Sequence, residues 1–244
     1  MTGGRSARIQ VLVAEQAARR GARVAVVDVC TAAVAALPIG GAGVTAMSRP
    51  AAGRPLCSTG PVSERIEELQ LTLGEGPGVD AHALGSAVLA PDLRADGERR
   101  RWPAFAPEAV ATGAAAVFAF PLRIGAISPG VLDLYSAVPV ELDSGELADA
   151  MVFADTATLV LLGTRIDPAW GPGSDLGGYR AEVDQATGML TVQLGVGIEE
   201  AFVRLRAHAY THGRRLAEAA ADVVAHRLRF TQDPDEERSA ADDA

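Results

Sequence analysis

The sequence predicts an α+β chain, with an antiparallel sheet and flanking helices first and a bundle of three helices last. Three observations support this fold class. In the first two thirds, short β-branched segments alternate with segments of helical spacing. In the last third, apolar residues recur every three or four positions, which places them on one helix face. Between these regions, residues 166–178 are rich in glycine and proline, so we expect a linker rather than one continuous rigid helix.

The first domain is expected to span residues 8–165 and to begin with two helices. Those helices are predicted at 6–20 and 24–37, and they suit either pairing with a second subunit or capping their own domain. Strands are predicted at 41–48, 54–59, 87–90, 114–122 and 130–136, and further helices at 61–71, 103–112 and 143–165. Asp143 and Glu146 have the spacing of a capping box at the start of the last helix.

Two segments of this domain admit more than one interpretation. Residues 74–80, GEGPGVD, are predicted as a tight loop. Its amides are candidates for an anion cradle, although the glycine spacing matches neither a Walker nor a Rossmann pattern. The run DGERRR at 96–101 stands beside Trp102 and suits either a nucleic-acid contact or, as we favour, a core tryptophan under a helix.

Some side chains of the first domain are assigned to the solvent and others to the core. The charges of the 61–71 helix are predicted to form a solvated face, and Cys57 is predicted to point inward. The charged residues in question are Glu64, Arg65, Glu67 and Glu68.

The composition is typical of a globular protein and does not favour a membrane protein or a disulfide-rich secreted protein. The chain has 244 residues, 48% of them hydrophobic, and a net charge of −9. No run of 18 apolar residues occurs, and the N-terminus lacks the pattern of a signal peptide, so we expect no membrane span and a cytoplasmic location. Two cysteines make a disulfide framework unexpected and fit a reducing compartment.

The last third holds three apolar ladders with helical spacing, within residues 179–230. Short breaks at 195–197 and 211–213 separate them, so neighbouring helices must pack together. The ladders are Tyr179, Val183, Ala186, Leu190 and Leu194; Ile198, Phe202, Leu205 and Ala209; and Leu216, Ala219, Ala220, Val223, Val224 and Leu228.

This region resembles the ANTAR domain, the RNA-binding output module of bacterial transcription antiterminators. The resemblance covers all three predicted helices, and one departure from the family pattern is Thr187, which stands where a lysine is usual. The matching positions are Gln185, Ala186, Gly188, Leu190, Glu200, Ala201, Phe202, Leu205, Arg206, Arg215, Leu216, Val223 and Val224.

Residues 23–165 in turn resemble a GAF domain, through GAGVTAMS, GEGPG, PLRIG and GVLDLYS in this order. The pairing of the two domains is typical of actinobacterial regulators. Gly78 stands where such proteins often have a cysteine, so a thiol sensor is not expected at that position. The Asn-Lys-x-Phe-Asp signature of cyclic-nucleotide GAF domains is also missing, because the chain has no lysine.

The resemblance implies a homodimer that binds tandem stem-loops in a nascent leader transcript and so prevents termination. The GAF-like domain would control binding, either as a small-molecule sensor or as a ligand-free dimerisation domain. The expected RNA-binding residues are Gln185, Thr187, Gly188, Arg206, Tyr210, Arg214 and Arg215. Gly188 would allow close approach of the RNA, Tyr210 would stack on a base and the arginines would hold phosphates. The structural alternatives are that Gly188 serves helix packing, that Tyr210 belongs to the core and that the arginines only keep the chain soluble.

Charge favours this function only weakly. Residues 177–229 hold seven arginines and six acidic residues, a net charge of +1, and an acidic tail at 231–244 is predicted to be disordered. The alternative is a protein-interaction module that binds no RNA.

No enzymatic motif is found, and we expect no catalytic residue, cofactor or metal. His208 and His212 are four residues apart, a metal-ligand spacing, but a polar helix face is the ordinary interpretation.

Overall fold

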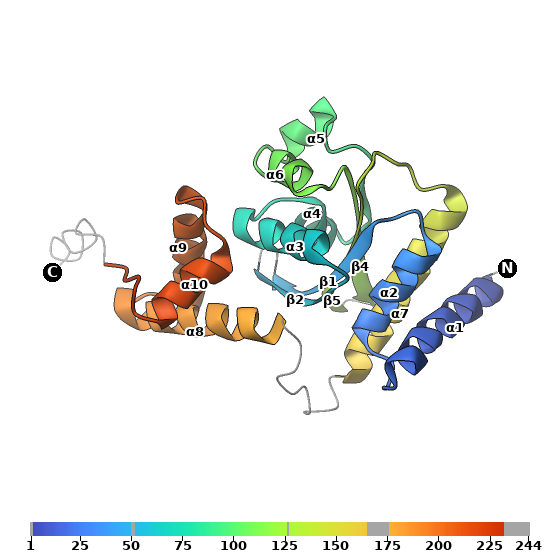
Figure 1. Ribbon diagram of the computed structural model, residues 1–244, viewed down its shortest axis with the longest axis horizontal. Helices are drawn as coiled ribbons and strands as arrows, with labels where there is room; N and C mark the ends of the chain where they lie inside the picture. Colours follow the sequence, from blue (N-terminus) through green and yellow to red (C-terminus); the bar gives the residue numbers. More distant parts are fainter. Residues whose placement is uncertain (1, 50–51, 126, 165–175, 232–244) are drawn as a thin grey trace. The chain divides into compact units, whose positions relative to one another are not determined.

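The computed structural model describes residues 2–49, 52–125, 127–164 and 176–231 (Figure 1). The chain divides into two compact units, Met1–Gly171 and Pro172–Ala244. The predicted linker at 166–178 and the predicted tail at 231–244 fall almost entirely outside the described residues. Only the first turn of α8 and Thr231 are described there.

The first unit is built on an antiparallel sheet of five strands, as predicted. The strand order is β2-β1-β5-β4-β3, so β5, the last strand in sequence, lies at the centre of the sheet. The register places Val44 opposite both Leu132 on β5 and Cys57 on β2. The strands are β1 (Gly41–Arg49), β2 (Ala52–Ser58), β3 (Val88–Ala90), β4 (Ala116–Ile124) and β5 (Ile127–Ser136).

Alternation along the strands divides the core into two layers. On β4, Phe118 and Phe120 pack into one hydrophobic cluster, whereas Val117 and Ala119 pack into another on the opposite face. Figure 1 shows α1 (Thr2–Arg20), α2 (Val26–Ala36) and α7 (Ser144–Thr164) on the first face. The second face is covered by α3 (Pro61–Leu73), α4 (Pro77–Leu84), α5 (Asp96–Arg101) and α6 (Phe105–Thr112).

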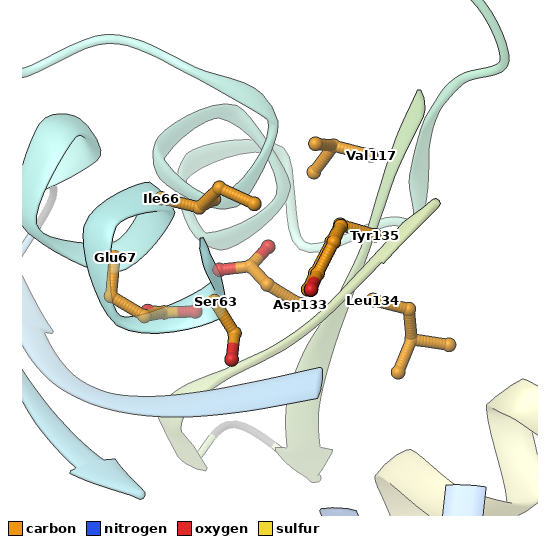
Figure 2. A pocket seen from close by; sticks show the side chains of 7 residues that line it. All are labelled: Ser63, Ile66, Glu67, Val117, Asp133, Leu134 and Tyr135. Carbon is orange, nitrogen blue, oxygen red and sulfur yellow. The ribbon is translucent and has the colours of Figure 1, made fainter. Parts of the chain in front are cut away.

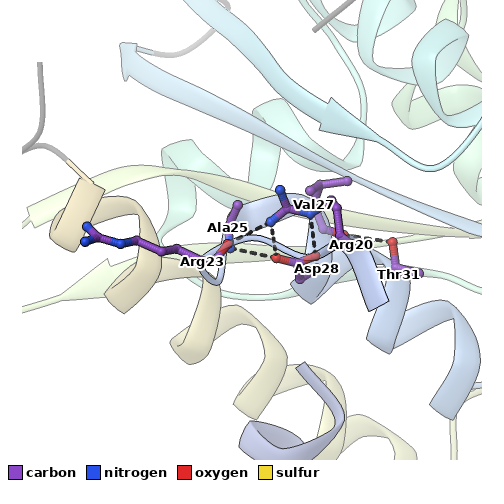
Figure 3. A network of polar contacts seen from close by, with 6 residues as sticks. All are labelled: Arg20, Arg23, Ala25, Val27, Asp28 and Thr31. Atoms are coloured by element: carbon purple, nitrogen blue, oxygen red, sulfur yellow. Dashed lines mark hydrogen bonds and ion pairs between the residues drawn. The ribbon is translucent and has the colours of Figure 1, made fainter. Parts of the chain in front are cut away.

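A polar network fixes the turn between α1 and α2 (Figure 3). The Asp28 carboxylate accepts hydrogen bonds from Nη2 of Arg20 at 2.7 Å and from the backbone amide of Ala25 at 2.8 Å. Arg20 also donates to the carbonyl oxygen of Arg23 at 2.8 Å. Asp28 is buried, so the arginine and the amide compensate a carboxylate that has left water.

The predicted capping box at the start of α7 is present. The Asp143 carboxylate accepts the backbone amides of Gly145 and Glu146 at 2.7 and 2.8 Å, and Glu146 accepts the amide of Asp143 at 2.8 Å. Farther along α7, Asp149 pairs with Arg5 and Arg8, which joins α1 to α7.

One loop assignment on the second face needs correction. The GEGPGVD segment is only partly a loop, because helix α4 begins at Pro77, a residue suited to the first turn of a helix. Its Gly78 amide donates to Gln70 and is therefore not offered to an anion. The DGERRR run forms helix α5, and Trp102 after it is buried in the core, which confirms the favoured interpretation.

The prediction of a solvated charged face on α3 is wrong for two of its four residues. Glu67 and Glu68 are each 2% exposed, and Glu67 accepts a hydrogen bond from Thr45 of the sheet. Cys57 points inward as predicted, and its Sγ lies 3.1 Å from Sγ of Cys30 on α2, both being free thiols.

The second unit is a bundle of three helices, α8 (Leu176–Leu194), α9 (Ile198–Thr211) and α10 (Leu216–Val224). Gly195 lies in the turn between α8 and α9, and Gly213 lies in the turn between α9 and α10. Their φ values are 68° and 59°, a left-handed conformation that favours glycine. The ladder residues form its core, except that Ile198 is exposed and the side chain of Tyr179 lies outside the described residues.

Among the described residues, no helix combines the length and the apolar character that crossing a membrane requires.

Candidate functional site

Two of the expected RNA-binding residues lie on the outer face of α8. Gln185 and Gly188 are exposed, whereas Val183, Ala186 and Leu190 form the buried face against α9 and α10. A β-carbon placed on Gly188 would have no atom within 4 Å apart from the neighbouring backbone of α8. The position is therefore open to an approaching ligand, and close helix packing does not account for its glycine.

Thr187 is the one expected residue that the structure places in the interior. Its side chain is 5% exposed, and its hydroxyl donates to the carbonyl oxygen of Val183 at 2.7 Å within the same helix. The reason is helical geometry, because Thr187 follows Val183 by four residues and so shares the buried stripe. A direct contact between the Thr187 side chain and RNA is therefore not supported.

Helix α9 presents Arg206 and Tyr210 on one side, four residues apart. The guanidinium of Arg206 lies 5.7 Å from the ring centre of Phe202, and partial burial lowers the pKa of Arg206. Tyr210 is 58% exposed, so the core alternative is wrong for this unit. Its ring is available for stacking on a base.

The remaining two expected residues stand in the turn between α9 and α10. Arg214 donates through Nη2 to the carboxylate of Asp222 at 2.7 Å. Arg215 is the N-cap residue of α10 and is exposed. The turn is compact because Gly213 adopts a left-handed conformation and the amide of Arg214 bonds to the carbonyl oxygen of Ala209.

The structure brings these residues together only in part. The three helices surround one core, so their outer faces point in different directions. Arg206 and Tyr210 share a face of α9, and Arg214 and Arg215 share a turn. Gln185 and Gly188 form a separate patch on α8, so one bundle does not gather all the expected residues on one surface.

Sequence reasoning missed the contacts that Arg227 and Phe230, which follow α10, make with the bundle. Arg227 pairs with Asp222, the residue that also holds Arg214. The rings of His208 and His212 stack with centres 4.0 Å apart, and Phe230 packs edge-on against His208 at 5.2 Å. Burial, then His212 and Arg214, lowers the pKa of His208.

The stacked histidines do not support the metal alternative. Nδ1 of His212 lies 2.9 Å from the carbonyl oxygen of His208, so this nitrogen bonds to the backbone. Across the residues that the structure describes, no group of three or more histidine, cysteine, aspartate or glutamate side chains has a metal-binding arrangement.

The first unit contains a second candidate site, a small pocket between α3 and the sheet (Figure 2). Its empty space of about 150 Å³ includes open solvent, and no part of it is wide enough for a water molecule. Glu67 and Asp133 are its ionisable carboxyl groups. The lining residues are Ser63, Ile66, Glu67, Val117, Asp133, Leu134 and Tyr135.

Neutral polar groups surround these two carboxyls. Thr45 donates its hydroxyl to Glu67, and Gln70 donates its amide to Asp133 at 2.9 Å. Burial, followed by the charge of Asp133, raises the pKa of Glu67 well above its usual range. Burial also raises the pKa of Asp133 to about 6, against the opposing hydrogen bonds of Glu67 and Gln70. Such a site suits a proton or a cation rather than an anion.

Comparison with known proteins identifies the second unit. Residues 179–224 match the ANTAR domain family, which spans most of α8 and all of α9 and α10. No curated protein matches the chain.

Solved structures resemble the first unit in fold. The GAF domain of a phosphoenolpyruvate-protein phosphotransferase from Coxiella burnetii aligns with a TM-score of 0.50 and 14% identity, over 67% of this chain and 98% of that chain. The corresponding GAF domain from Acinetobacter aligns with a TM-score of 0.49 and 11% identity, over 68% of this chain and 96% of that chain. The chain therefore joins a domain of GAF-like fold to a C-terminal ANTAR domain.

Proposed function

We propose that this chain is a transcription antitermination regulator whose ANTAR domain binds tandem stem-loops in nascent transcripts under control of its GAF-like domain. The observation that carries the proposal is the coincidence of the family match with a complete helical bundle. Residues 179–224 supply their own core, and the bundle exposes Gln185, Arg215 and Tyr210 to solvent.

The exposed groups suit RNA loops better than a regular RNA helix. Bases in loops are unstacked, so they are accessible to an aromatic ring and to forked donors. Tyr210 supplies the ring, and Arg214 and Arg215 supply the donors. The net charge of +1 over residues 177–229 offers few phosphate contacts, so loop recognition must supply much of the affinity.

A homodimer follows from the same proposal, because two stem-loops need two modules. The outer face of α7 provides support for it. Met151 and Leu159 are 55% and 57% exposed, and Asp155 is the only charged residue between positions 150 and 164 of this helix. Val11 on the neighbouring α1 is also exposed. We propose that α1 and α7 pair with the same helices of a second copy, which covers these apolar side chains.

The control role of the first domain has two forms, dimerisation and ligand sensing. The pocket between α3 and the sheet leaves no room for a water molecule in this conformation, so it favours dimerisation over ligand sensing. A thermal-shift screen of the full chain against small amines and metabolite mixtures tests the sensing role. The proposal assigns the chain no catalytic activity and no cofactor, and places its action in the cytoplasm with nascent transcripts.

A gel-shift titration of the full chain tests the function. The probe is a leader RNA with two tandem hairpins, and the control RNA has both loops scrambled. Saturable binding of the first RNA alone supports the proposal, and loss of affinity with rising salt identifies phosphate contacts. Equal binding of both RNAs, or none, contradicts loop recognition. Salt-independent association with another protein then favours the protein-interaction alternative.

A further inference from the structure

The described chain continues past the family match and folds back onto the bundle. Helix α10 ends at Val224, and His226 follows with φ of 59°, a left-handed conformation that is uncommon for a residue other than glycine. The amide of Arg227 then donates to the carbonyl oxygen of Asp222 at 2.8 Å. This is the hydrogen bond of a Schellman turn, and it reverses the chain over the last turn of α10.

The reversal brings the Arg227 side chain onto Asp222. Nε and Nη2 of Arg227 both lie 2.6 Å from Oδ1 of Asp222. The other carboxylate oxygen, Oδ2, accepts from Nη2 of Arg214 at 2.7 Å. Two guanidinium groups from separate segments, the α9–α10 turn and the segment after α10, therefore converge on one carboxylate.

The segment that carries Arg227 is anchored to the rest of the bundle. Phe230 donates its amide to Oε1 of Gln193 on α8 at 3.3 Å, and its ring packs against His208 on α9. Leu228 is also packed against the bundle core. Because both sides of Arg227 are held, its guanidinium is presented from a fixed turn rather than from a loose tail.

The charges at this point do not cancel. Two arginines against one aspartate leave a net charge of +1, and hydrogen bonds from Arg214 and then Arg227 lower the pKa of Asp222, so it stays ionised. The Arg214 and Arg227 side chains are 35% and 64% exposed, which leaves guanidinium surface open to solvent. Each guanidinium has five N–H donors, more than the contacts with Asp222 use.

We propose that Arg214 and Arg227, aligned by Asp222, form a clamp for one backbone phosphate of the bound RNA. The proposal rests on the RNA-binding function proposed above and extends the interface beyond residue 224. Paired guanidinium groups bind phosphate through charge-assisted, forked hydrogen bonds, and a carboxylate that orients both groups reduces the entropy lost on binding. Such a contact fixes the register of the RNA without reading its sequence.

The test uses the full chain with the tandem-hairpin RNA at several salt concentrations. The variants are Arg214→Ala, Arg227→Ala and the double substitution. The matched control is Arg204→Ala, which removes one arginine of the same bundle that pairs with Glu200 at 2.7 Å on α9. Circular dichroism melting of each variant checks that the bundle still folds.

A shared phosphate makes a specific prediction for the double variant. Each single substitution should weaken binding by roughly tenfold and lower the salt slope by about one phosphate contact. The double variant should lose little more than either single variant, in both affinity and slope, because the same contact is removed. Arg227→Lys should recover only part of the affinity, since lysine keeps the charge but not the fork.

Failure of the proposed clamp and failure of the proposed RNA-binding function give different results in this experiment. If the wild-type chain binds the RNA and Arg227→Ala behaves like the Arg204→Ala control, the clamp is wrong and the proposed function stands. Additive losses, with twice the change in salt slope, mean two separate phosphate contacts and also overturn the clamp. If the wild-type chain does not distinguish the tandem hairpins from the scrambled control, the proposed function itself fails.

Discussion

The carboxyl groups of Glu67 on α3 and Asp133 on β5 interact directly in the buried layer between helix and sheet (Figure 2). Both side chains are almost fully buried. Two adjacent carboxylates cannot both ionise at low cost, so the pair is expected to retain a proton near neutral pH. The groups that face this pair are Thr45, Cys57, Ser63, Gln70 and Tyr135.

This pair predicts that the first unit becomes less stable as pH rises. The pKa of Asp133 is about 6 in the folded chain, against an ordinary value of 3.8. Its contribution to stability is therefore complete below about pH 4 and is lost as pH rises through about 6. Asp133→Asn cannot lose a proton, so it should raise the melting temperature at pH 7.5 by several degrees and flatten the profile between pH 4 and 7.

Glu67→Gln provides the companion variant for this prediction, because the pKa of Glu67 is raised as well. It should also stabilise the first unit at pH 7.5. Asp96→Asn, at an exposed position of α5, is the surface control. A melting temperature for Asp133→Asn that falls at pH 7.5, or that keeps the wild-type pH dependence, would show that the pair is not protonated as described.

The cysteine pair predicts slow thiol chemistry in the folded chain. The hydrogen bond with Cys57, and then burial, raise the pKa of Cys30 well above its usual range. The thiolate is the reactive species, so a chromogenic disulfide reagent should label the native chain far more slowly than the urea-unfolded chain. Two thiols per chain should react after unfolding. Rapid labelling of one thiol in the native state would contradict the buried placement.

The Arg20–Asp28 network predicts a graded loss of stability at the turn between α1 and α2. Asp28→Ala removes both the arginine partner and the acceptor of the Ala25 amide, so it should lower the free energy of unfolding by about 1–3 kcal/mol. Asp28→Asn retains an oxygen for the amide and should cost less. Urea unfolding of the first unit measures both, and equal losses would mean that the cap contributes nothing.

Much of this fold follows from periodicity in the sequence. All five strands and the long helices were predictable, because residues such as Val117 and Phe118 alternate between two apolar layers and the C-terminal ladders repeat at helical spacing. The short helices α4 and α5 were missed, since Pro77 and the DGERRR run suggest a loop and a charged surface when tertiary contacts are unknown.

The site was less predictable for two physical reasons. The burial of Glu67 depends on partners far away in sequence, Thr45 and Asp133, which no local pattern reveals. The placement of Arg227 depends on a left-handed backbone at His226, where the usual glycine signal is missing. Thr187 is a different case, because it was expected to bind RNA although its spacing of four residues from Val183 is the spacing of the buried stripe.

Tyr210 is exposed on the bundle and Thr187 is buried, so substitutions at these two positions are expected to have opposite effects on RNA binding. Tyr210→Ala removes an exposed ring, so it should weaken RNA binding by about 5-fold or more, the range of one stacked base, with little change in stability. Thr187→Val removes a buried hydroxyl that bonds to the backbone of its own helix, and it should leave RNA affinity within about twofold of wild type. Titrating the tandem-hairpin RNA against both variants, with melting curves in parallel, measures the difference. A large loss of affinity from a well-folded Thr187→Val chain would mean that this position acts on RNA despite its burial, and unchanged binding by Tyr210→Ala would remove the stacking role from α9.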